Sequence, residues 1–246
     1  MQEDPSFGPV AQYYDELMKN VPYAMWVSYY LLLLAHQDVH PKSMLDVCCG
    51  TGVMCEMLAG EHFQPEGLDL SAGMIDEARR KARRKKLDIA YHVADAAHFQ
   101  LNKTFDAALS FFDSLNNILD PADLQSAFHQ VAAHVKPGGS WIFDLNTAYA
   151  FEARMFNQEN VRANARLRYK WIGEWDPETR QITVDMRFWR GEEEFREVHR
   201  QRAYEQEEVE FMLRKAGFGH IRVFHSYTLN PPRFKSDRLH YTAIRL

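Results

Sequence analysis

The sequence has few cysteines, no long apolar run and little excess of either charge. Its three cysteines, Cys48, Cys49 and Cys55, fall within one short segment, and adjacent cysteines cannot easily form an ordinary disulfide with each other. A metal site would need further ligands from elsewhere in the chain, and no Cys-x-x-Cys pair supports one. The cysteine content therefore argues against a disulfide-stabilised secreted domain, and we expect reduced, packed thiols and no bound metal.

Membrane and export signals are also missing. The most apolar run, residues 31–35, is far shorter than the ~20 residues that a membrane-spanning helix needs, so it is expected to be a buried helix. The first five residues have neither the basic start nor the apolar stretch of a secretory signal. We expect a cytoplasmic protein with no membrane partner.

The formal net charge of -5 gives no general attraction to phosphate backbones or anionic membranes. A local exception is the basic run at residues 79–86. On a helix whose other side carries Ile75, Ala78 and Ala82, these charges are expected to form mostly a solvated outer face. Nucleic acid is therefore an alternative partner that the sequence does not favour.

The order of predicted elements is informative, because 246 residues with 46% hydrophobic content can bury a substantial core. Helices are expected over residues 10–35, 53–59 and 120–135, and after Ser71, a predicted N-cap. Apolar runs between them predict strands at residues 43–48, 89–94, 105–112 and 140–145, and one ending at residue 70. The predicted strand at residues 140–145 follows the turn Pro137-Gly138-Gly139. Such alternation requires a mostly parallel sheet with helices on both faces.

The pattern changes at about residue 166, where apolar and polar residues begin to alternate. Leu167, Tyr169 and Trp171 share one parity, and a second alternating run follows at residues 182–188. This period of two predicts antiparallel strands inserted before the last helix, at residues 205–216, which Gly217 ends. Two further apolar runs, at residues 220–227 and 239–244, are expected to complete the sheet.

The strongest local signal is an apolar strand that ends in an acid and runs into a glycine turn, from Met44 through Asp46 to Gly50 and Gly52. Such a turn lets a ligand approach the backbone at the carboxyl edge of a parallel sheet, where α/β folds bind their ligands. A structural turn with no ligand is the alternative interpretation.

Two later acids favour a ligand. Asp69 ends the second predicted strand and Asp95 follows the third, so both are expected at the same sheet edge as Asp46. An acid at the second strand can accept hydrogen bonds from two ribose hydroxyls, and one after the third can accept from an adenine amino group. The three acids together predict a site for an adenosine-containing ligand.

These motifs resemble those of the class I S-adenosylmethionine-dependent methyltransferases. The resemblance runs along the chain through residues 45–52 as the cofactor loop, 67–71 with the ribose acid, Ala94-Asp95-Ala96 as the adenine contact, 105–109 as the fourth strand, and Lys136-Pro137-Gly138-Gly139. Residues 11–18 with Tyr14-Asp15, the turn at 114–117 and residues 199–204 look like a bacterial small-molecule or uncharacterised branch of that superfamily.

The resemblance implies a Rossmann-like α/β fold: a mostly parallel seven-stranded sheet with helices on both faces and a small antiparallel β insertion. It divides the chain into an N-terminal helical cap (1–40), a cofactor-binding core (41–150), an antiparallel insertion that covers the acceptor (151–204), and a final helix with the last two strands (205–246). The implied activity is in-line transfer of a methyl group from S-adenosylmethionine to a small-molecule acceptor, leaving S-adenosylhomocysteine. An RNA (tRNA) methyltransferase and a non-catalytic S-adenosylmethionine-binding protein are the alternatives.

The resemblance also implies roles for individual residues. The expected cofactor-binding residues are Tyr14, Asp46, Cys48, Gly50, Gly52, Asp69, Leu70, Met74, Asp95, Ala96 and Phe111. The expected substrate-binding residues are Phe112, Asp113, Asn116, Trp171 and His199. His199 is the candidate general base because imidazole titrates near neutral pH, although a histidine in a strand can equally make a structural hydrogen bond. Phe111, Phe112 and the aromatic residues Tyr13, Tyr23 and Trp26 can equally serve packing.

Cys48 departs from the family pattern, because it stands where the first glycine of the cofactor loop is usual. We expect its small side chain to be tolerated if the backbone there has a negative φ. A nicotinamide-dependent dehydrogenase is the rival interpretation of the glycine turn. It is disfavoured because its third glycine would fall at Cys55, so that Gly-x-Gly-x-x-Gly is incomplete.

Overall fold

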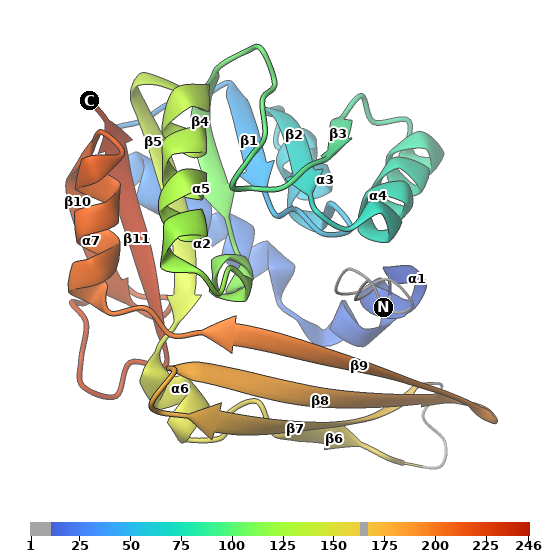
Figure 1. Cartoon of the computed structure of the whole chain (residues 1–246). Coiled ribbons are helices and arrows are strands. Elements are labelled where there is room, and N and C mark those ends of the chain that lie inside the picture. The colour runs from blue at the N-terminus through green and yellow to red at the C-terminus, as the bar shows by residue number, and fades with distance from the viewer. Residues whose placement is uncertain (1–10, 163–166) are drawn as a thin grey trace.

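A computed structural model describes residues 11–162 and 167–246. Val10, where the first predicted helical segment begins, and Arg166, where the alternating pattern begins, lie outside the described residues. The core is a seven-stranded sheet in the order β10-β11-β5-β4-β1-β2-β3 (Figure 1). Its strands are β1 (Ser43–Val47), β2 (Gln64–Asp69), β3 (Ala90–Val93), β4 (Phe105–Ser110), β5 (Val135–Asn146), β10 (Phe218–His225) and β11 (Arg238–Arg245). The first five pair in parallel, whereas β11 runs antiparallel to both β5 and β10. The predicted fold class is confirmed.

Helices cover both faces of this sheet (Figure 1). The longer ones are α2 (Tyr23–His36), α3 (Val53–Gly60), α4 (Ala72–Lys85), α5 (Pro121–His134) and α7 (Gln206–Lys215). Because side chains alternate along a strand, Met44 of β1 packs in the cluster of α2, whereas Leu45 and Val47 pack in the cluster of α5 and α7. The two hydrophobic clusters hold the strands in fixed positions relative to one another. The acids at or near the strand ends are therefore held at one edge of the sheet.

The caps and turns explain where several helices begin. The side chain of Ser71 accepts a hydrogen bond from the backbone of Met74, as the predicted N-cap of α4. Asp120 caps α5 in the same way, directly before Pro121. The helical opening predicted over residues 10–35 is, within the described part, divided into α1 (Ala11–Leu17), a 3-10 turn η1 (Met18–Asn20) and α2. The break precedes Pro22, because proline disfavours helical geometry in the residue before it and Val21 is extended, with ψ 129°.

A second prediction is corrected at the Pro137-Gly138-Gly139 segment, which is part of β5 rather than a turn before it. The pairing of β4 with β5 shifts register there, and Gly138 has φ +80°. A Cβ on Gly139 would lie 2.6 Å from the backbone oxygen of Asp106. The segment is therefore a strand irregularity that depends on glycine, and β5 begins directly after α5.

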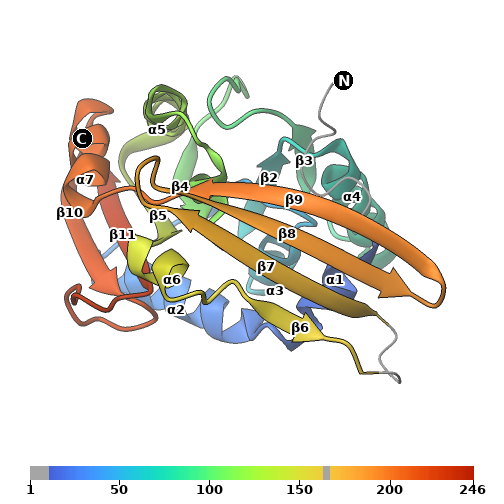
Figure 2. The same cartoon turned by 60° about the horizontal axis from the view of Figure 1, so that its bottom comes forward.

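A separate antiparallel sheet has the order β6-β7-β8-β9, formed by β6 (Gln158–Asn160), β7 (Arg168–Asp176), β8 (Gln181–Arg190) and β9 (Glu193–Arg202). Two short elements, η2 (Ser114–Asn117) and α6 (Ala148–Glu152), lie between it and the core. Figure 2 shows this sheet extending across the end of the molecule where β5 and α6 lead into it. Along β8, buried side chains alternate with less buried ones, so one face packs inward, as the period of two predicted. Neither described range contains a helix that is long and apolar enough to cross a membrane.

Candidate functional site

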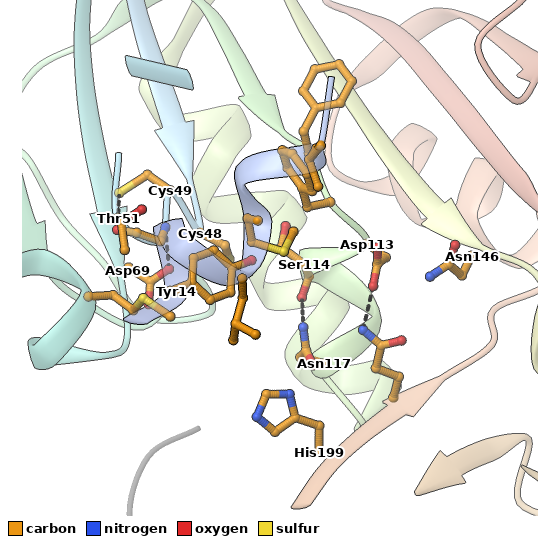
Figure 3. Close-up of a pocket in the computed structure, with 18 of the residues that line it drawn as sticks. Tyr14, Cys48, Cys49, Thr51, Asp69, Asp113, Ser114, Asn117, Asn146 and His199 are labelled. Atoms are coloured by element: carbon orange, nitrogen blue, oxygen red, sulfur yellow. Dashed lines mark hydrogen bonds between the residues drawn. The ribbon is translucent and has the colours of Figure 1, made fainter. Parts of the chain in front are cut away.

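A cavity of about 690 Å³ lies where the carboxyl ends of the parallel strands meet α1, η1 and the antiparallel sheet. Figure 3 shows Tyr14, Cys48 and Asp69 on one side of it, Asp113 and Asn146 on the other, and His199 facing them. This is the sheet edge at which open α/β folds bind ligands. The cavity therefore brings together residues from both the predicted core and the predicted insertion.

The glycine turn after β1 forms one wall of the cavity. Its backbone is left-handed at Cys48 (φ +65°), Gly50 (φ +53°) and Gly52 (φ +77°). Gly50 lines the cavity, and a Cβ placed there would meet nothing within 4 Å. The negative φ that would make the Cys48 side chain easy to tolerate is not found, and a left-handed conformation costs a residue with a side chain about 1–2 kcal/mol. Cys48 therefore has the left-handed backbone that glycine usually adopts at this position of the family pattern, although it carries a side chain.

Gly52 has a different role from the one predicted. It is not among the residues that line the cavity, and a Cβ there would lie 2.4 Å from the hydroxyl oxygen of Tyr91. The absence of a side chain at Gly52 therefore lets the loop pack against β3. The expectation that Gly52 contacts the ligand is corrected by this placement.

Asp69 and Asp95 both border the cavity and are held by the backbone. The two carboxylate oxygens of Asp69 accept hydrogen bonds from the backbone N–H of Gly50 at 2.8 Å and of Ser71 at 2.9 Å. Asp95 accepts one from the backbone N–H of Ala97 at 2.8 Å and pairs with His98 at 3.1 Å. Each carboxylate oxygen has more than one lone pair, so both side chains can still accept hydrogen bonds from a ligand.

Asp46 lies deeper than the other two acids. It is buried, and the thiol of Cys55 donates to its Oδ2 at 3.4 Å. Burial raises the pKa of Asp46 from 3.8 to about 7, while the thiol contact opposes and the charge of Asp69 reinforces the shift. The aspartate is thus held where its charge is costly unless a cationic group lies nearby.

This raised pKa predicts a pH-dependent stability. Because the folded state keeps the proton of Asp46 while the unfolded state releases it, the free energy of unfolding falls as the pH rises between about 4 and about 7. Asp46→Asn cannot ionise, so we expect its stability to fall less over that interval. Urea unfolding of both proteins without cofactor at a series of pH values measures this. Parallel pH profiles would contradict the assigned burial cost.

The loop after β4 forms the opposite wall around an ion-pair cluster. Asp113 has φ +47°, and its backbone N–H donates to Oδ2 of Asp144 at 2.9 Å. Arg238 of β11 joins the two carboxylates, donating to Asp113 at 2.7 Å and also to Asp144, which is fully buried. The amide nitrogen of Gln201 donates to the other oxygen of Asp113 at 2.7 Å. Three residues from three strands, Asp144 of β5, Gln201 of β9 and Arg238 of β11, thus hold Asp113 at the cavity.

Aromatic rings cover the same wall. The ring centroid of Phe112 lies 3.6 Å from that of Trp26 and 4.8 Å from that of Tyr23. The guanidinium of Arg238 lies 5.7 Å from the Trp26 ring. Phe111 is buried against Tyr30 in an edge-on contact of 5.7 Å. Tyr23 and Trp26 therefore belong to the cavity wall. The sequence had allowed either packing or a role in the site for both.

The antiparallel sheet contributes His199 and Trp171 to the cavity. His199 is buried, and its Nε2 lies 2.9 Å from Oε2 of Glu197, two residues away on the same strand face. Asn116, expected to contact the substrate, is instead a fully buried tie between the core and the sheet. Its amide nitrogen donates to the backbone oxygens of Asn146 at 3.1 Å and Arg202 at 2.8 Å. Its amide oxygen accepts from Asn146, and it does not line the cavity, so that prediction is wrong.

The remaining predicted site residues all line the cavity: Tyr14, Asp46, Cys48, Gly50, Asp69, Leu70, Met74, Asp95, Ala96, Phe111, Phe112, Asp113, Trp171 and His199. Lining residues that the sequence did not single out include Leu17, Thr51, Ser114, Asn117, Asn146, Gln201 and Arg238. Thr51 could have been inferred from its place between the two glycines, whereas Gln201 and Arg238 had no local signal. In the part of the chain that the structure describes, no group of three or more His, Cys, Asp and Glu side chains could hold a metal ion.

Comparisons with known proteins agree on one kind of domain. The family model described as a methyltransferase domain matches residues 44–139. YqeM of Bacillus subtilis (strain 168), a methyltransferase by name, is 30% identical over 239 residues, which cover 95% of this chain and 94% of that protein. A dTDP-3-amino-3,6-dideoxy-alpha-D-glucopyranose N,N-dimethyltransferase of Streptomyces fradiae is 34% identical over 134 residues, covering 54% and 51%.

Solved structures give the same result. The S-adenosylmethionine-dependent methyltransferase from Clostridium acetobutylicum ATCC 824 has a TM-score of 0.84 at 26% identity, covering 96% of this chain and 98% of that one. DesVI of Streptomyces venezuelae has a TM-score of 0.79 at 22% identity, covering 97% and 98%. The similarity to both structures includes the core and the antiparallel sheet, since it spans nearly the whole chain.

Proposed function

Because the chain belongs to the class I S-adenosylmethionine-dependent methyltransferases, enzymes whose cofactor is S-adenosylmethionine, we propose that it methylates a small molecule bound between the sheet edge and the antiparallel sheet. The observation that carries this proposal is the single cavity that borders both the strand-end acids and the inner face of the antiparallel sheet. One end of it suits a nucleoside and the other a separate acceptor.

The residues present fit the cofactor. Asp69 would accept hydrogen bonds from the ribose hydroxyls and Asp95 from the adenine amino group, while the open space at Gly50 would admit the ligand next to the backbone. The buried carboxyl of Asp46 is suited to pair with the cationic amino group of the methionine part. When bound, S-adenosylmethionine supplies a methyl group on a sulfonium, which needs little further activation. The residues of the chain therefore have to bind and orient the two reactants and exclude water.

Orientation is the main catalytic contribution expected from the protein. Holding a nucleophile in line with the reacting carbon can contribute roughly 7–11 kcal/mol in favourable model systems. Aromatic faces near the sulfonium, such as those of Phe111 and Phe112, add about 0.5–2 kcal/mol through cation–π attraction. His199, oriented by Glu197 at 2.9 Å, is proposed to receive a proton from the acceptor.

The charges around the cavity favour an amine as the nucleophile. Among the described residues, the charged side chains that line it are Asp46, Asp69, Asp95, Asp113, Asp237 and Arg238. Attack by an alkoxide would place a negative charge among these carboxylates, whereas a neutral amine becomes a cation on methylation. The partial similarity to an amino-sugar N,N-dimethyltransferase is consistent with this choice.

The basic run at residues 79–86 offers little support for RNA as the acceptor. Lys81 pairs with Asp15, Lys85 with Glu56, and Arg80 with Glu77. Charges already neutralised within the protein attract phosphates less than free ones. These contacts favour the interpretation that the basic run at residues 79–86 is a solvated and internally paired helix face rather than a surface that binds nucleic acid.

The proposal is tested with methyl-labelled S-adenosylmethionine offered to small-molecule extract, tRNA and total protein. We expect the label in the small-molecule fraction, on a product that a cation exchanger retains. Label in tRNA or protein would refute the acceptor class. Cofactor binding by calorimetry without any label transfer would instead indicate a non-catalytic binding protein.

A further inference from the structure

Three consecutive residues of α1 contact three different parts of the molecule. The hydroxyl of Tyr13 accepts a hydrogen bond from Arg190 of β8 at 3.0 Å, and its ring stacks on Phe195 of β9. Tyr14 lines the cavity. Asp15 contacts the core, so this short helix bridges the antiparallel sheet and the cofactor loop.

The contact of Asp15 with the core is a close cluster of three side chains. Its Oδ2 lies 2.6 Å from Nζ of Lys81 on α4, and its Oδ1 accepts from the hydroxyl of Thr51 at 2.6 Å. Nζ of Lys81 is also 3.4 Å from that hydroxyl. Thr51 is the residue between Gly50 and Gly52, so the cluster joins α1 directly to the turn that contacts the cofactor.

The charge of Lys81 makes this cluster sensitive to the position of α1. The Lys81 side chain is 4% exposed, and an ammonium group buried to that extent needs an opposite charge. Glu56 is the other nearby carboxylate, but it lies 4.0 Å from Lys81 and is already paired with Lys85 at 2.6 Å. Movement of α1 away from the core would therefore leave Lys81 poorly compensated.

We propose that Asp15 and Lys81 are positioning residues which, through Thr51, dock α1 on the cofactor loop and so hold Tyr14 against the bound cofactor. This inference rests on the cofactor placement proposed above. Its consequence is that the ion pair controls cofactor retention more than acceptor recognition, because Asp113, Gln201 and His199 of the acceptor wall belong to other elements. Release of S-adenosylhomocysteine then requires the pair to open.

The test compares Asp15→Asn with Asp106→Asn. Asp106 forms a lysine pair of the same length, 2.6 Å to Lys136, and its substitution should lower stability without affecting the cavity, which it does not line. We expect Asp15→Asn to raise the Kd of S-adenosylhomocysteine by about 10-fold or more, with a faster release rate. The KM for S-adenosylmethionine should rise more than the KM for the acceptor. Asp106→Asn should leave the Kd unchanged.

Trypsin cleavage after Lys19, which is exposed in η1, reports α1 undocking independently of turnover. Wild-type cleavage should slow when S-adenosylhomocysteine is added, and Asp15→Asn should remove most of that protection. Lys81→Met should give the same Kd as Asp15→Asn, and the double variant should add little, because both break one pair. An unchanged Kd in Asp15→Asn and Lys81→Met, or an equal rise in Asp106→Asn, would overturn the inference. Either result leaves the labelled-methyl test of the proposed function unaffected.

Discussion

Arg238→Met is expected to lower the free energy of unfolding by about 3–5 kcal/mol, since it removes one partner of a buried ion-pair network. Arg238 is the cation that joins Asp113 to Asp144, and the Asp144 side chain has no exposed surface. Methionine keeps much of the apolar volume but leaves both carboxylates without their cation. Chemical denaturation at neutral pH measures the loss directly.

A paired substitution separates the charge effect from lost packing. Asp144→Asn in the Arg238→Met background removes one of the two stranded charges, so it should restore part of the lost stability. The double variant is therefore expected to be more stable than Arg238→Met alone. The alternative result is that Asp144→Asn lowers the free energy of unfolding as much in the Arg238→Met background as it does alone. In that case the network does not stabilise the protein through its charges.

Asp69→Ala is expected to raise the Kd of S-adenosylmethionine by about 10- to 100-fold, because hydrogen bonds to a charged group are each worth about 1.5–3 kcal/mol. The substitution removes the proposed ribose acceptor. It also removes the carboxylate that holds the backbone N–H groups of Gly50 and Ser71. Both effects weaken the cofactor end of the cavity, and calorimetric titration measures their sum.

Asp69→Asn serves as the conservative comparison. Asparagine keeps one acceptor oxygen but replaces the other with a donor that faces a backbone N–H, so an intermediate Kd is expected. Asp106→Asn, at a carboxylate outside the cavity, should leave the Kd unchanged. An Asp69→Ala protein that is folded by circular dichroism and binds the cofactor normally would refute the assigned role of Asp69.

The sequence predicted the strand-end acids of the cavity better than the residues of its loops. Asp46, Asp69 and Asp95 each follow or end an apolar strand, and parallel strands bring such positions to one edge whatever the details of packing. Asn116 was wrong because its neighbours Ser114 and Asn117 line the cavity while its own side chain turns inward. In a turn, a shift of one residue changes the direction of the side chain, and no periodicity fixes it.

Cys48 illustrates a limit of a different kind. A side chain at this position is tolerated most easily with a negative φ, but the glycine turn imposes +65°. Closure of the loop between β1 and α3, with the backbone of Gly50 held by Asp69, outweighs a local preference worth about 1–2 kcal/mol. Local rules give way where neighbouring contacts fix the backbone.

The sequence by itself determined the order of strands and helices in the parallel core, the fold class and the three acids at the strand ends, because these depend on hydrophobic periodicity and turn chemistry within short windows. The tertiary structure alone decided that Arg238 meets Asp113, 125 residues away, and that Lys81 meets Asp15, 66 residues away. Such pairs form only when separate elements pack together and exclude water. A charge then becomes costly unless its partner is already in place, and no local pattern in the chain records that condition.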